Sequence, residues 1–155
     1  MEERYDAQKH VLFQKVARRY GADLSGKIIG LWGLAFKPGT DDMREAPSVV
    51  LLHELIGAGA RVIAHDPVAM HAARKELPAA WFASGQLRFV EDQYDALKDV
   101  DAVVLVTEWK SFRHPDHERM RTLMKNPVIF DGRNQYEPKV MREAGFEYHA
   151  IGRGA

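Results

Sequence analysis

Short apolar runs alternate with segments of helical periodicity along almost the whole chain. The apolar runs are KIIGLWGL, RVIAHDP, LRFVED, DAVVLVTEW, PVIFDG and EYHAIG. Because helical patterns separate successive runs, the chain predicts right-handed βαβ units, which build a parallel sheet with helices on both faces. We therefore expect an α/β fold of the Rossmann-like, doubly wound type, with a mainly parallel sheet of about six strands preceded by one helix.

The charge balance and the residue usage argue against several classes of function. The 155-residue chain carries 22 Lys and Arg residues against 22 Asp and Glu residues, so its formal net charge is zero. Such a chain has no global attraction for nucleic acid or for an anionic membrane, and we expect neither as a partner. It contains no cysteine, which excludes disulfides, thiolate metal ligands and thiol nucleophiles. The charged start MEERYDAQKH lacks the apolar segment of a signal peptide, and we expect a cytoplasmic location.

The first segment, EERYDAQKHVLFQKVARRYG, predicts a helix that ends at Gly21. Acidic residues cluster at its start, and Lys15, Arg18 and Arg19 lie at its end, an arrangement that complements the helix dipole. No capping residue precedes it. We therefore expect the chain to begin inside a helix of a longer protein.

The loop FKPGTDDMRE follows the first apolar run and directly precedes a helix start. Lys37 and Arg44 are hydrogen-bond donors without acceptor function, and backbone N–H groups at a helix start favour an anion. Phe36 either stacks on a ring of a ligand or closes the core. Asp41 and Asp42 are better explained as residues that shape the loop than as an acid–base pair. From these residues alone, an anion-binding loop and a purely structural loop are equally good interpretations.

A second candidate lies in DGRNQY, directly after the apolar run PVIF. The turn at Asp131 and Gly132 would direct Arg133 toward the edge of the sheet that carries Lys37. Two cationic side chains on one edge favour a ligand that carries a diphosphate.

The dinucleotide fingerprint G-x-G-x-x-G is absent at the first turn from strand to helix. The glycines there are Gly30, Gly33 and Gly39, whose spacing does not match. Asp66 ends the second apolar run, where an acid could bind a ribose, but its neighbour Pro67 favours a role in the turn. The sequence therefore predicts Rossmann-like topology without an ordinary NAD site.

The segment SFRHPDHERM brings two histidines and an aspartate close together. The spacing of His114, Asp116 and His117 matches no known zinc motif, and we interpret the segment as a surface loop and a helix start. We expect no metal site and no complete set of catalytic residues in this chain.

The stretch GLWGLAFKPGTDDMREAPS resembles the start of the C-terminal, nucleotide-sugar-binding domain of the UDP-glucose/GDP-mannose dehydrogenase family. HDP after the second apolar run, DAVVLVTEW and FDGRN agree with this resemblance, which covers nearly the whole chain. Within the family, the pattern is nearest to the bacterial enzymes that act on UDP-glucose. Members combine an N-terminal NAD-binding domain, a long connecting helix and this C-terminal domain. The resemblance thus implies that residues 1–21 end the connecting helix and that residues 22–155 form the nucleotide-sugar-binding domain.

The resemblance also implies roles for particular residues. Phe36 and Lys37 match the pair that contacts the UDP-sugar, Arg133 matches an arginine that reaches the sugar nucleotide, and Arg44 matches an arginine that reaches NAD. The nucleophilic cysteine of the family lies upstream, so no catalytic residue is expected in this fragment. Gly39 departs from the Asn or Asp that is also common at its position.

For the full-length protein, the resemblance implies an NAD-dependent oxidoreductase that converts UDP-glucose to UDP-glucuronate in two hydride transfers. NAD would be bound mainly by the missing N-terminal domain, the full-length protein would be a homodimer, and the fragment alone would be inactive. Two alternatives stay open. One is a dehydrogenase domain for another sugar nucleotide, such as UDP-N-acetylmannosamine or GDP-mannose. The other is a fragment that keeps only an oligomerisation role.

Overall fold

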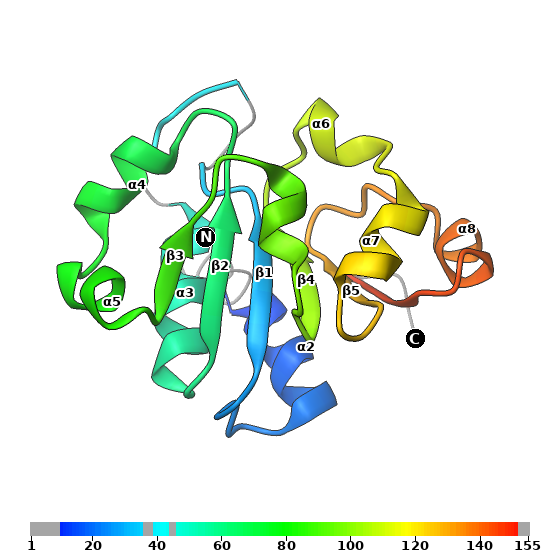
Figure 1. Cartoon of the computed structure of the whole chain (residues 1–155), viewed down its shortest axis with the longest axis horizontal. Helices are drawn as coiled ribbons and strands as arrows, with labels where there is room; N and C mark the ends of the chain where they lie inside the picture. Colours follow the sequence, from blue (N-terminus) through cyan, green and yellow to red (C-terminus); the bar gives the residue numbers. More distant parts are fainter. Residues whose placement is uncertain (1–9, 36–38, 44–45, 152–155) are drawn as a thin grey trace, which may run out of the picture.

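Six parallel strands form one sheet in the order β3-β2-β1-β4-β5-β6 (Figure 1). The structure is a computed structural model, and it describes residues 10–35, 39–43 and 46–151. The strands are β1 (Ile28–Trp32), β2 (Arg61–His65), β3 (Leu87–Phe89), β4 (Ala102–Leu105), β5 (Val128–Asp131) and β6 (Glu147–Ala150). This arrangement confirms the expected α/β doubly wound fold. Its chain reversal lies between β1 and β4, where ligands of such folds bind.

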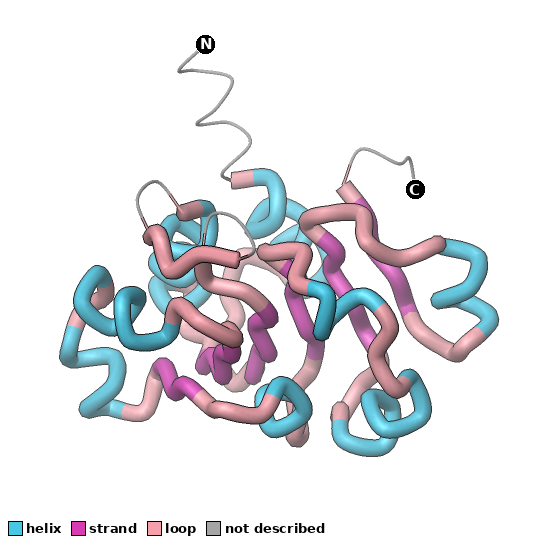
Figure 2. The backbone as a smooth tube through the Cα atoms, turned by 90° about the horizontal axis from the view of Figure 1, so that it is seen from above, coloured by secondary structure: helices cyan, strands magenta, loops and turns pink. Residues whose placement is uncertain are grey.

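Helices cover both faces of the sheet (Figure 2). One face carries α2 (Val11–Tyr20), α3 (Pro47–Gly57), α4 (Met70–Glu76) and α5 (Ala79–Ser84). The other carries the 3-10 helix η1 (Gln93–Leu97), α6 (Lys110–Arg113), α7 (His117–Leu123) and α8 (Pro138–Glu143). Successive residues of a strand alternate between the two layers. Val104 packs with the first layer, and Val103 and Leu105 pack with the second, so both faces of β4 are buried as its continuous apolar sequence predicts. Within the described residues, no helix has the length and apolarity needed to cross a membrane.

Two short helices, α5 and α6, lack the apolar pattern by which a helix is predicted from sequence. Helix α5 spans six residues, none of them buried, so it lacks the apolar stripe by which helices are recognised in a sequence. Helix α6 spans four residues and buries only Phe112. The 3-10 helix η1 follows β3, and Asp92 caps it by accepting a hydrogen bond from Tyr94 N–H.

Helix α2 packs against α3 and β5 and ends at Gly21, as the sequence predicts. Leu12 and Val16 are buried, and Arg19 donates from Nε to Oε2 of Glu147 at 2.6 Å. This hydrogen bond lowers the pKa of the Glu147 carboxyl below its usual range. The division of the chain at residue 21 stays a prediction, because the residues upstream of 10 lie outside the described ranges.

The Tyr20 phenol ties the end of α2 to the sheet and makes this contact sensitive to alkaline pH. It donates to the backbone carbonyl of Asp101 at 3.2 Å, and burial raises its pKa to about 12. The raised pKa means that the folded state favours the neutral phenol. The contribution of this phenol to the free energy of unfolding is therefore complete below pH ~10 and is lost as the pH rises through 12. We expect wild type to lose roughly 1 kcal/mol more stability over this window than Tyr20→Phe, since the phenol is only half-buried. Urea unfolding from pH 8 upward measures the difference, and parallel pH profiles would contradict the assignment.

Candidate functional site

The candidate site lies at the carboxyl edge of the sheet, where the ends of β1, β2, β4 and β5 meet (Figure 1). Arg133 follows β5 on this edge, and the loop that contains Lys37 and Arg44 follows β1 on the same edge. Of the four residues predicted to bind substrate or cofactor, Arg133 is described, whereas Phe36, Lys37 and Arg44 lie outside the described residues. The described part of the site consists of Arg133 and the backbone on either side of the loop.

Asp66 holds the backbone that leads into this loop. Its carboxylate is fully buried after β2 and accepts hydrogen bonds from three chain segments, two of which are distant from it in the sequence. The donors are the backbone N–H groups of Leu34 (2.7 Å), Ala35 (3.2 Å), Val68 (2.8 Å) and Ala69 (2.7 Å), together with the indole N–H of Trp109 (3.4 Å). Because these donors occupy both oxygens, the carboxylate has no capacity left for a ribose. The interpretation of Asp66 as a turn residue is confirmed.

The crevice between β1 and β4 is filled by the chain itself. Gly33 adopts a φ of 101°, and a Cβ at this position would lie 2.5 Å from the Cβ of Thr107. The Thr107 hydroxyl donates to the backbone carbonyl of Ala35 at 2.7 Å. In dinucleotide-binding domains a glycine at this turn lets the pyrophosphate approach the backbone. Here it makes room for Thr107 instead, in agreement with the absent fingerprint.

The described part of the loop after β1 is anchored where it joins α3. The Ser48 hydroxyl donates to the backbone carbonyl of Leu34 at 2.5 Å, and the Met43 side chain is buried. The N–H of Asp42 donates to the Thr40 hydroxyl at 3.1 Å. Both ends of the loop are thus fixed to the domain.

Arg133 stands on a turn whose backbone is fixed by Asp131, a fully buried residue at the end of β5. One carboxylate oxygen accepts the N–H of Arg133 at 3.0 Å, and the other accepts the N–H of Tyr136 at 3.0 Å and the phenol of Tyr148 at 2.7 Å. Burial, together with the nearby Asp131 charge, raises the pKa of the Tyr136 phenol, which donates to the backbone carbonyl of Phe112. The turn therefore presents Arg133 from a rigid base.

The guanidinium of Arg133 reaches the surface and contacts a partner that the sequence did not reveal. Its Nη2 lies 3.1 Å from Oε1 of Glu108, which follows β4, and both side chains are exposed. The two residues are 25 positions apart in the sequence and meet only because β4 and β5 are neighbours in the sheet. An exposed ion pair of this kind contributes little stability, so an anionic ligand can displace the carboxylate at small cost.

The His114–His117 segment has a structural role. Asp116 caps α7 by accepting the N–H of Arg119 at 3.1 Å, and the His117 ring packs edge-on against Phe146. Across the described ranges, no group of three or more acidic, histidine or cysteine side chains could hold a metal ion. The interpretation as a loop and a helix start is confirmed.

Comparison with known proteins agrees with this architecture. A model of the UDP-binding domain of the UDP-glucose/GDP-mannose dehydrogenase family matches residues 30–138. The UDP-glucose 6-dehydrogenase of Pseudomonas aeruginosa is 48% identical over 153 residues, which cover 99% of this chain and 34% of that protein. The chain thus spans about a third of the length of this relative.

Two solved structures resemble the chain. A UDP-glucose dehydrogenase from Pyrobaculum islandicum has a TM-score of 0.72 at 34% identity and covers 93% of this chain and 29% of its own. A UDP-D-ManNAc dehydrogenase from Pyrococcus horikoshii has a TM-score of 0.67 at 26% identity and covers 96% of this chain and 31% of its own. With the family model matching well over half of the residues, the resemblance seen in the sequence is confirmed. The chain belongs to the UDP-glucose/GDP-mannose dehydrogenase family and carries its UDP-binding domain.

Proposed function

We propose that this chain is the UDP-sugar-binding part of an NAD-dependent UDP-glucose 6-dehydrogenase. The full-length protein would oxidise UDP-glucose to UDP-glucuronate in two hydride transfers and work as a cytoplasmic homodimer. The proposal rests on the position of Arg133. Its guanidinium stands on a rigid turn at the carboxyl edge of the sheet, the edge at which the loop after β1 begins. Family membership supplies the identity of the anion.

Each residue has a defined part in binding. Arg133 pairs with the diphosphate through charge-assisted hydrogen bonds, while Phe36 and Lys37 contact the UDP-sugar. A turn that is already fixed by Asp131 loses little conformational freedom on binding, which favours affinity and accurate placement of the sugar. Deprotonation of the nucleophile and covalent chemistry belong to residues outside this chain, because the chain has no cysteine.

NAD would accept the hydride in the full-length protein. In this chain Thr107 fills the crevice at the β1 turn, where the pyrophosphate of a dinucleotide would lie. The Asp66 carboxylate accepts backbone N–H groups and is not available to a ribose. The described residues therefore do not fit a dinucleotide in the usual way. The proposal therefore places NAD mainly on another part of the protein, with Arg44 reaching toward it. The chain alone should produce no NADH from UDP-glucose.

Removal of the guanidinium tests the binding role. Arg133→Ala should weaken UDP binding by roughly ten-fold or more, the loss expected for a charge-assisted hydrogen bond, and Lys37→Ala should act similarly. Arg88→Ala is the matched control, because Arg88 is an exposed arginine on β3, on the other side of β1 in the sheet. Isothermal calorimetry with UDP measures all four proteins. Equal losses from Arg133→Ala and Arg88→Ala would refute the assignment.

A second candidate is a dehydrogenase domain for UDP-N-acetylmannosamine, which the likeness to the Pyrococcus horikoshii protein favours. Both candidates share the UDP group, so UDP itself does not separate them. Titration with UDP-glucose and with UDP-N-acetylmannosamine does: tighter binding of UDP-glucose supports the first candidate, and the reverse order supports the second.

A further inference from the structure

Glu108 is the only carboxylate that contacts the Arg133 guanidinium among the residues that the structure describes. Its Oε1 lies 3.1 Å from Nη2 of Arg133. Both neighbours of Glu108 in the chain are anchored. The Thr107 hydroxyl donates to a backbone carbonyl after β1 at 2.7 Å, and the Trp109 indole donates to Asp66 at 3.4 Å. Because the turn that carries Arg133 is rigid as well, the carboxylate has a fixed place beside the guanidinium.

The contact with Glu108 leaves most of the guanidinium free for a ligand. Only Nη2 of Arg133 takes part in it, and within the described ranges Nη1 and Nε donate to no other residue. Arginine has five N–H donors, so a phosphate can bind either beside the carboxylate or in its place.

Glu108 opposes an anionic ligand in both arrangements. If the carboxylate stays, a phosphate oxygen that accepts from the same nitrogen lies at most about 6 Å from Oε1, and the two negative charges repel each other. If the phosphate takes its place, binding costs the ion pair. The affinity for an anion at Arg133 therefore depends on Glu108 in either case.

We propose that Glu108 is a specificity-determining residue that sets the preference of this site for nucleotide sugars over free nucleotides. The inference rests on the proposed UDP-sugar function. The diphosphate of a UDP-sugar carries two negative charges, whereas free UDP carries a third on its terminal phosphate at pH ~8. Repulsion by Glu108 grows with the charge of the ligand, so it weakens the binding of UDP more than that of UDP-glucose.

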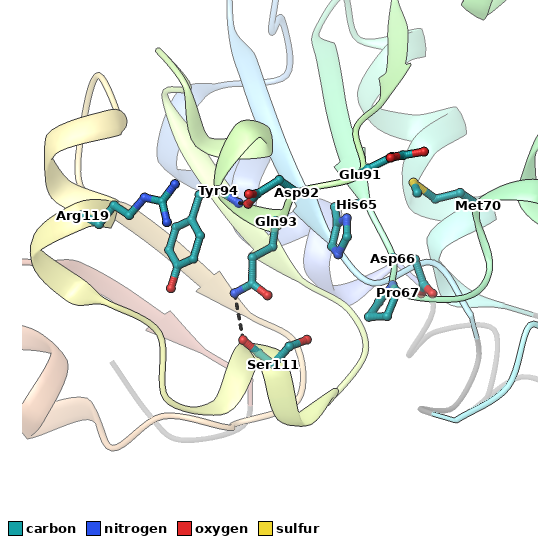
Figure 3. Close-up of a pocket in the computed structure, with 10 residues that line it drawn as sticks. All are labelled: His65, Asp66, Pro67, Met70, Glu91, Asp92, Gln93, Tyr94, Ser111 and Arg119. Carbon is teal, nitrogen blue, oxygen red and sulfur yellow. Dashed lines mark hydrogen bonds between the residues drawn. The ribbon is translucent and has the colours of Figure 1, made fainter.

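Two further carboxylates at this edge of the sheet lie too far from Arg133 to have the same effect. Glu91 and Asp92 follow β3 and line a cleft at the carboxyl ends of β2 and β3 (Figure 3). Strands β3 and β5 are four positions apart in the sheet, about 19 Å. This distance exceeds the screening length of about 10 Å at ~0.1 M salt. The exposed Glu91 side chain is therefore a matched control for Glu108.

Isothermal calorimetry with UDP and with UDP-glucose, at pH ~8 and ~0.1 M salt, tests the proposal. Glu108→Gln should bind UDP roughly ten-fold more tightly than wild type, and UDP-glucose roughly three-fold more tightly. Glu91→Gln should leave both affinities unchanged. The urea midpoint of Glu108→Gln should stay close to that of wild type, because both members of the ion pair are exposed. A gain of affinity that follows the charge of the ligand does not arise from damage to the fold.

An unchanged or weaker affinity of Glu108→Gln for UDP would overturn the proposal, and so would equal gains for UDP and UDP-glucose. Equal gains in Glu91→Gln and Glu108→Gln would also overturn it, because the effect would then belong to the overall charge of the chain. No binding of ~10 mM UDP to any of these proteins would refute the UDP-sugar site and this inference with it. UDP binding that Arg133→Ala weakens and Glu108→Gln does not strengthen would refute this inference alone.

Discussion

Replacement of Asp66 by alanine should lower the free energy of unfolding of this chain by at least about 3 kcal/mol. The substitution leaves the N–H groups of Leu34, Ala35 and Ala69 without an acceptor, and all three residues are fully buried. Each unsatisfied buried donor costs about 1–3 kcal/mol. The backbone that enters the loop after β1 should be released at the same time, so UDP binding should also weaken. Urea unfolding followed by circular dichroism measures the loss of stability.

Asp116→Ala is the matched control for this experiment. Asp116 also accepts a backbone N–H, but it is an exposed cap of α7, and its removal should cost only about 1 kcal/mol. Equal costs for the two substitutions would mean that the buried donors find water or other partners, and would contradict the role assigned to Asp66.

Replacement of Gly33 by alanine should have an effect of similar size for a different reason. The residue has a φ of 101°, and an added Cβ would lie 2.5 Å from the Thr107 side chain and 2.6 Å from its backbone nitrogen. Backbone strain contributes about 1–2 kcal/mol and overpacking a further 1–3 kcal/mol. We expect a total loss of roughly 3 kcal/mol, measured as a lower urea midpoint with an unchanged m-value.

Gly85→Ala separates the two contributions. Gly85 has a φ of 81°, but nothing lies within 4 Å of an added Cβ. This control should therefore lose only the backbone part, about 1–2 kcal/mol. If Gly33→Ala costs no more than Gly85→Ala, the crevice between β1 and β4 is not filled as the structure indicates.

The fold could be predicted because its determinants are local. The continuous apolar run around Val103 and Val104 marks a strand buried on both faces, and Gly21 marks the end of a helix. Arg133 was found in the same way, since the turn DGR directly follows a recognisable strand. Helix α5 escaped detection because none of its six residues is buried.

The supports of the site could not be read from the sequence because their partners come from distant segments. Asp66 accepts from Leu34 and Trp109, which are 32 and 43 positions away, and its neighbour Pro67 suggested only a local turn. Glu108 meets Arg133 across two neighbouring strands. In each case the chemistry of the residue was visible, but its function depends on which strands lie side by side.

Titration of the chain with UDP tests the central claim most directly. Binding to the carboxyl edge should be saturable, with a Kd in the millimolar range because other parts of the protein would complete the site, and the backbone amides of Ala35 and Arg133 should shift in NMR spectra. The shifts should be absent from the amino edge of the sheet, for example at Lys27. No saturable binding at ~10 mM UDP, or shifts confined to the amino edge, would contradict the assignment of a UDP-sugar site to this chain.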